Sequence, residues 1–213
     1  AGLAAGAYNN EVISLASTGA ASQTVTCNGN VFNTQLTAGS LTAFGPVCIN
    51  TTSGPQSFTL SGTDLTTANI TVGPLTGFTF STTSGGTYTS SLIITQPGGT
   101  YSGTVYVKFT PTLVQSYNGN IPVSGAGASA IIVVASGSGI NTTPTVLSVN
   151  PATLVTGTTA TCSGDVTDAG CQTITARGIC YGTTANPDIS GPKTTETGTT
   201  GAFSSNLTGL TPA

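Results

Sequence analysis

Short runs of alternating apolar and polar residues recur along the chain, separated by clusters of Gly, Pro, Asn and Ser. A period of two predicts half-buried β-strands, and such clusters predict the turns between them. Amphipathic stretches of helical period are nearly absent. The expected strands cover residues 56–62, 68–73, 90–96, 103–111, 117–125, 129–137, 159–167, 173–182 and 201–210.

Strands that return every ~8 to 12 residues with turn signals between them are typical of antiparallel β-sandwiches. A stretch rich in Gly, Thr and Pro at 137–152 predicts a domain boundary. We therefore expect an all-β chain with two sandwiches in tandem, at 19–140 and 141–213, preceded by a separate strand within 1–18. The second sandwich is short, because a seven-stranded sandwich needs about 100 residues.

The composition excludes most chemistry. The chain has only 3 Lys and Arg, 6 Asp and Glu, and no His, Trp or Met. Without an imidazole, Ser-His-Asp and Cys-His catalysis and His-based zinc sites cannot be built. Three cations cannot neutralise a run of nucleic-acid phosphates. We therefore expect no enzyme, no cofactor, no nucleic-acid partner and no membrane insertion, and instead a structural or adhesive role.

Two sequence blocks resemble known families. The first block contains SGPQSFTLSG at 53–62, VYVKFTPT at 105–112, SYNGNIPVSG at 116–125 and VVASGSG at 133–139, and it resembles Hydin-type Ig-like domains. The second block contains TARGICYGTTANPDIS at 175–190 and KTTETGTTGAFSSNLTGLTPA at 193–213, and it is similar to the fibronectin-III-like repeat of Bacteroidota surface proteins. The resemblance implies an exported surface protein whose second sandwich lacks its closing strands.

The segment Gly6, Ala7, Tyr8, Asn9, Asn10, Glu11 and Val12 resembles the last strand of that repeat, placed at the other end of the chain. An incomplete sandwich exposes unpaired backbone groups, which favours pairing with a strand from elsewhere. Two interpretations follow. Either the sequence is an out-of-phase stretch of a tandem array, in which this segment closes the preceding repeat, or identical chains donate strands to one another. Both interpretations predict a rod. The alternative is an N-terminal extension that packs on its own domain. Simple donation has one difficulty, because the family has two closing strands and this segment supplies one.

Five cysteines in an exported chain favour disulfides. We expect Cys27 to pair with Cys48, and Cys162 to pair with Cys171 across the turn-rich sequence CSGDVTDAGC. Cys180 is then a buried thiol, and Cys162–Cys180 is the rival pairing. We expect no metal site, because the three C-terminal cysteines lack a fourth soft ligand. Asp165 and Asp168 read as turn residues rather than as a calcium site, which needs six to eight oxygens.

The function expected from these observations is a structural or adhesive module of an extracellular bacterial filament or repetitive adhesin. Its partners would be copies of itself or neighbouring repeats, head to tail, with surface glycan as a further ligand. The alternative is a carbohydrate-binding or spacer module of a large secreted enzyme.

Overall fold

The computed structural model describes residues 3–148 and 151–211. Every regular element in these ranges is a β-strand. The chain divides into two compact units, of which the first ends at Ser138 and the second begins at Gly139. The sequence placed this boundary between residues 140 and 141.

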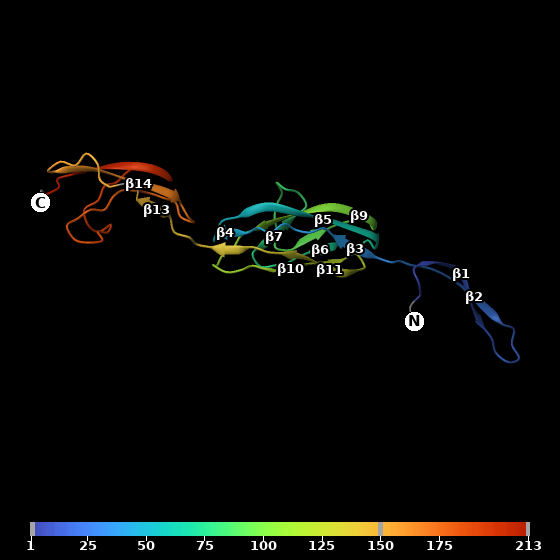
Figure 1. Ribbon diagram of the computed structural model, residues 1–213. Coiled ribbons are helices and arrows are strands. Elements are labelled where there is room, and N and C mark those ends of the chain that lie inside the picture. Colours follow the sequence, from blue (N-terminus) through green and yellow to red (C-terminus); the bar gives the residue numbers. More distant parts are fainter. Residues whose placement is uncertain (1–2, 149–150, 212–213) are drawn as a thin grey trace. The chain divides into compact units, whose positions relative to one another are not determined.

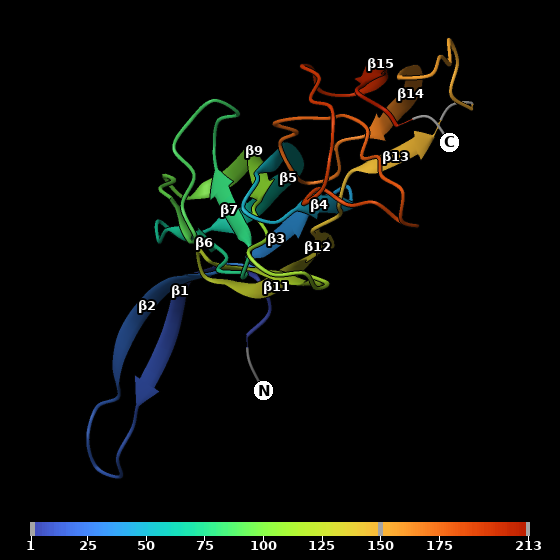
Figure 2. The ribbon, with the colours of Figure 1, turned by 90° about the vertical axis from the view of Figure 1, so that its left-hand side faces the viewer.

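The first unit contains two four-stranded antiparallel sheets that form a sandwich (Figure 1). One sheet has the order β3-β5-β9-β7 and the other has the order β11-β10-β6-β8. Figure 2 shows the same layers from a perpendicular direction. The strands of the first sheet are β3 (Gln35–Ala38), β5 (Ser53–Leu65), β9 (Gly99–Phe109) and β7 (Phe78–Ser81). Those of the second are β11 (Ala128–Ala135), β10 (Gly119–Gly125), β6 (Ile70–Val72) and β8 (Leu92–Ile94).

The core of the sandwich forms because alternate residues of each strand point inward. Along β9, for example, Val105, Val107 and Phe109 are fully buried while the residues between them are partly exposed. The Phe109 ring contacts Phe78 and Tyr117, with ring centroids 4.8 and 5.3 Å apart. The other fully buried side chains include Leu60, Ile70, Val72, Phe80, Ile121 and Val123.

Polar groups inside this unit are hydrogen-bonded, as buried polar groups must be. The Gln96 side chain is almost completely buried, and its Nε2 donates to the carbonyl oxygens of Thr66 and Ala68, both at 2.6 Å. The Tyr117 hydroxyl accepts the backbone N–H groups of Thr112 and Leu113, both at 3.0 Å, and fixes the turn that follows β9. Hydrogen bonds to this oxygen lower the pKa of Tyr117, the one to the Thr112 side chain most of all.

The first strands of the chain differ from the prediction. β1 (Gly6–Leu15) pairs with β2 (Gln23–Val31) in an antiparallel hairpin, and the two form a sheet of their own. The sequence had assigned residues from 19 onward to the sandwich. The sandwich sheets instead begin with β3, because β2 uses its backbone groups to pair with β1. The remaining strands near the sandwich are β4 (Pro46–Cys48) and β12 (Ser138–Ile140), which includes the unit boundary.

The second unit has one three-stranded antiparallel sheet in the order β13-β14-β15. Its strands are β13 (Thr145–Ser148), β14 (Thr159–Asp168) and β15 (Gly201–Thr208). The strand expected at 173–182 forms only isolated bridges, Arg177 with Glu196 and Cys180 with Lys193. The all-β class and the antiparallel architecture are confirmed, with a two-sheet sandwich in the first unit. The second unit is the less complete of the two, with one sheet and a facing segment of irregular chain.

Candidate functional site

The β1–β2 hairpin exposes apolar side chains on a surface with almost no charge. Val12, Ile13, Leu15 and Val25 are each between 50% and 58% exposed. Of the ten residues of β1, only Tyr8 is partly buried, and the single charged residue is Glu11. A two-stranded hairpin is marginally stable by itself in water. Its apolar side chains and the free edge of β1 therefore favour pairing with another strand.

A β-bulge decides which β1 residues share a face. Tyr8 is opposite Gly29 and Glu11 is opposite Cys27, so two residues of β1 oppose one of β2 between these pairs. Asn10, with a φ of 62°, lies in the bulge, and its N–H donates to the Asn28 Oδ1 at 2.6 Å. Gly29 and Cys27 are two residues apart on β2 and point the same way.

The bulge therefore places Tyr8, Glu11, Ile13 and Leu15 on one face of β1, and Val12 on the other. Without the bulge, a period of two would place Tyr8 on the same face as Val12 and opposite to Leu15, so the bulge reverses both relations. An open cavity beside the bulge is lined by Leu3, Tyr8, Glu11, Cys27, Asn28 and Gly29, and so includes Tyr8 and Glu11 of the first face.

In the second unit, the inner face of the three-stranded sheet is built from small and apolar residues. Ala160, Val166, Ser205 and Leu207 are buried there. Gly164 lies under the Phe203 ring: a Cβ at residue 164 would stand 2.8 Å from the ring. The glycine is therefore what lets this aromatic side chain lie flat on β14. Above it, an open cavity of about 320 Å³ is lined by Pro144, Val146, Val166, Thr173, Ile174, Thr175, Ala176, Arg177, Gly178 and Phe203.

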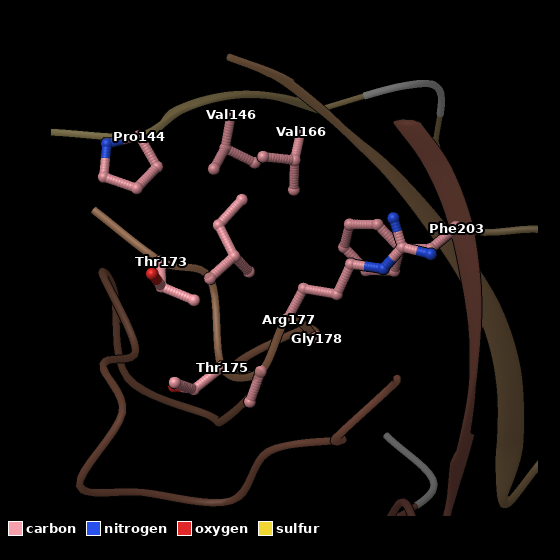
Figure 3. A pocket seen from close by; sticks show the side chains of 10 residues that line it. Pro144, Val146, Val166, Thr173, Thr175, Arg177, Gly178 and Phe203 are labelled. Carbon is pink, nitrogen blue, oxygen red and sulfur yellow. The ribbon is translucent and has the colours of Figure 1, made fainter. Parts of the chain in front are cut away.

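Arg177 holds the irregular segment, residues 173–181 and 193–200, against this sheet. Its guanidinium Cζ lies 5.1 Å from the Phe203 ring centroid, in a cation–π contact visible in Figure 3. Its Nε donates to the Thr197 carbonyl at 3.2 Å, and its Nη1 donates to the Gly201 carbonyl at 2.9 Å. Nη1 also lies 3.2 and 3.3 Å from the carbonyls of Thr199 and Thr200. Sequence reasoning did not single out Arg177, although it is one of only three cations in the chain.

A series of side-chain hydrogen bonds also fixes the part of this segment at residues 193–200. The Thr194 hydroxyl donates to the buried Ser205 Oγ at 2.8 Å, and Ser205 donates to the Glu196 carboxylate at 3.0 Å. The N–H of Ile179 donates to the Thr194 Oγ1 at 2.9 Å. A hydrogen bond to a charged group, such as that of Ser205 to Glu196, contributes about 1.5 to 3 kcal/mol, so these polar groups help to position the segment.

Within the residues that the structure describes, the segment around Arg177 pairs on one side only. Arg177 exchanges both backbone hydrogen bonds with Glu196, at 3.4 and 2.7 Å. The Ile179 carbonyl accepts from Thr194 and the Tyr181 N–H donates to Pro192. In an antiparallel pair the residues between such bonds point their N–H and C=O groups away from the partner strand. Gly178 and Cys180 therefore present an unpaired strand edge.

The cysteines do not pair as expected. Cys27, Cys162 and Cys180 are free thiols, so Cys27–Cys48, Cys162–Cys171 and Cys162–Cys180 are not the pairings in the structure. Cys48 and Cys171 are disulfide-bonded.

Local structure explains both errors. Cys27 lies exposed in β2 opposite Glu11 of the hairpin, outside the sandwich sheets. Cys162 lies within β14, which runs on to Asp168 as a strand and not as a turn. At ~3.3 Å per strand residue, about 20 Å separate Cys162 from the end of β14, far beyond the ~7 Å limit for bridged Cα atoms.

The acidic residues have local roles. Asp168 is the last residue of β14, and its Oδ1 accepts the N–H of Gly170 at 2.8 Å, so its side chain stabilises the turn that follows the strand. Asp165 lies within the same strand and not in a turn. The Asp188 carboxylate accepts the hydroxyl and the N–H of Ser190, at 2.5 and 2.8 Å, and these bonds lower the pKa of Asp188.

Within residues 3–148 and 151–211, no group of three or more His, Cys, Asp or Glu residues is arranged to hold a metal ion. The same residues contain no helix that is long and apolar enough to cross a membrane.

Comparisons with known proteins find similarity among solved structures but no matching family. No family model matches the chain, and no curated protein matches it. Among solved structures, the chain is similar to the crystal structure of chicken CNTN1 FN1-FN3 domains, with 13% sequence identity and a TM-score of 0.24. That match covers 94% of this chain and 67% of the CNTN1 chain.

Proposed function

We propose that this chain is a structural and adhesive module of an extracellular bacterial filament or long repetitive adhesin, of the type found on Bacteroidota surfaces. The modules join head to tail, by β-strand complementation between copies or as a tandem array. The chain is not an enzyme. Its partners are further copies or repeats, with surface glycans as the ligands that adhesion would use.

The observation that carries this proposal is the exposed hairpin. Ile13 and Val25 lie directly opposite each other, and both are at least half exposed. Isolated chains avoid such exposed strands, usually by placing Lys on them. Here neither strand of the hairpin carries a Lys or an Arg, and the whole chain has only three such residues. Such a surface would promote aggregation of a free monomer, whereas in a polymer it would form the contact between modules.

Two further features support the extracellular location. Cys48 and Cys171 are disulfide-bonded, and disulfides persist mainly in oxidising compartments. The neutral Thr, Ser and Asn surface lets modules pack closely with little electrostatic repulsion, since charged residues make up only 4% of the chain. These features fit a filament and do not depend on a particular ligand.

Electron microscopy of natively isolated material tests the proposal. We expect filaments with a regular axial repeat. Boiling in denaturant then distinguishes the two modes of joining, because a strand-donated polymer releases chains that each carry one copy of this sequence, whereas the repeats of a tandem array stay covalently joined. Discrete particles of one size would contradict the filament, and glycan binding by such particles would favour the carbohydrate-binding alternative.

A matched pair of variants tests the role of the hairpin. Ile13→Lys with Val25→Lys places charge on its apolar face and should abolish filaments. Thr18→Lys with Ser22→Lys adds the same charge at exposed residues outside the two strands and should leave filaments intact. Filaments that form equally well from both variants would show that the hairpin does not join the modules.

A further inference from the structure

We propose that the hairpin β1–β2 of one chain docks on the second unit of another copy, with β1 pairing along the open edge at Gly178 and Cys180. This inference rests on the proposed function, in its strand-complementation form, and identifies the surface that receives the hairpin.

The first argument is the number of strands. The second unit has a three-stranded sheet and, facing it, the bridged pair of segments around Arg177 and Glu196. Adding both strands of the hairpin brings the unit to about seven strands, as in an Ig-type sandwich. This resolves the difficulty that a single donated strand leaves one strand missing, since β2 accompanies β1 as a preformed partner.

The second argument is the orientation of the open edge. Arg177, Thr194 and Glu196 contact β15 or the chain leading into it, so they lie on the inner face of the bridged pair. Because side chains alternate along a strand, Cys180 and Lys193 lie on the outer face. An open cavity of about 310 Å³ occurs there, lined by Ala176, Arg177, Gly178, Cys180, Ile189, Lys193, Thr194 and Thr195. A strand that pairs along this edge would therefore extend the bridged pair to three strands and share its inner and outer faces.

The third argument is charge. The Lys193 ammonium donates to the Ile189 carbonyl at 2.8 Å and has no carboxylate partner within the described residues. Glu11 has no cationic partner in those residues either. A β1 strand that turns its Glu11 face outward at this edge brings the one charge of the hairpin toward Lys193. Val12 then points inward, toward the cavity beside Phe203, whose lining includes Val146, Val166 and Ile174.

Cross-linking to the native Cys180 thiol tests the docking. Cys27→Ser and Cys162→Ser leave Cys180 as the free thiol of the chain. In this background, Tyr8→Cys, Glu11→Cys and Ile13→Cys each place a thiol on the outward face of β1. Assembled material is treated with a short bis-maleimide and run on denaturing gels. We expect a ladder of covalently linked chains from at least one of the three variants.

Two controls define the result. Adding Cys180→Ser to the cross-linking variant should abolish the ladder, and Ser14→Cys, on the opposite face of β1, should give little of it. Polymer that forms without any ladder would overturn this acceptor edge while leaving the proposed function standing. A link within one chain, seen as an unchanged chain mass, would overturn docking between copies. Absence of polymer would instead reject the proposed function itself.

Charge reversal provides an independent test. Glu11→Lys or Lys193→Glu alone should raise the concentration needed for assembly by about two- to fivefold, the effect of one exposed ion pair. The double variant should return it toward the original value. Additive losses without rescue would show that these two side chains do not meet.

Discussion

The two units of this chain are stabilised in different ways. In the first unit two sheets enclose an apolar core in which Phe80, Phe109 and Leu60 are fully buried. In the second unit one sheet faces a segment tethered by Arg177, Thr194 and Glu196. Apolar burial is non-directional and scales with the area removed from water, whereas each hydrogen bond depends on one specific partner. The first unit therefore depends mainly on its core, and the second mainly on the hydrogen bonds of these three side chains.

The largest effect should come from the core of the first unit. Phe109→Ala removes a fully buried ring that contacts three other aromatic rings, and it should lower the free energy of unfolding by about 3 to 5 kcal/mol. Denaturant unfolding followed by tyrosine fluorescence measures this. Phe32→Ala is the control, because Phe32 is 61% exposed and its loss should change little. Similar losses in the two variants would mean that the first unit is not held by this core.

A substitution under Phe203 should damage the second unit alone. Gly164→Ala places a methyl group against the ring and should cost about 1 to 3 kcal/mol, the usual range for overpacking. Hydrogen exchange should rise in β14 and β15 and stay unchanged in β5 and β9. Ser163→Ala, one residue away, adds no bulk and serves as the control. Faster exchange in both units would contradict their separate stabilisation.

Removing the guanidinium fork should loosen the tethered segment without unfolding the sheet. Arg177→Lys keeps the charge but cannot reach several carbonyls at once. We expect faster hydrogen exchange at residues 173–181 and 193–200, with β14 protected as before. Lys108→Arg, at the other unit, controls for a change of cation alone. Unchanged exchange in the segment would show that Arg177 does not position it.

The smallest effect should be a local one at acid pH. The lowered pKa of Asp188 means that the folded turn favours the carboxylate. The stabilisation is therefore present above the ordinary Asp pKa of 3.8 and is lost as the pH falls through the lower folded value. The amide resonance of Ser190 should titrate with a midpoint below 3.8. Asp188→Asn should remove this titration, and a midpoint at or above 3.8 would contradict the hydrogen bonds of the turn.

Much of the strand pattern could be read from the sequence. The segments expected at 56–62, 103–111 and 159–167 correspond to β5, β9 and β14, because period-two alternation reports burial on one side directly. The segment expected at 173–182 failed as a regular strand, since its pairing is limited to short bridges and its position depends on side-chain hydrogen bonds. Alternation carries no information about such tethers.

The sequence by itself determined that the chain is all-β, nearly uncharged and without an imidazole, because these follow from composition and periodicity. Only the tertiary structure decided that residues 23–31 pair with β1, that the bulge separates Val12 from Tyr8, and that Cys27 and Cys162 remain free. Pairing partners, register and disulfides depend on distances between residues far apart in the chain. Local sequence preference does not contain those distances, so the open edge at Gly178 and Cys180 was visible only in the folded molecule.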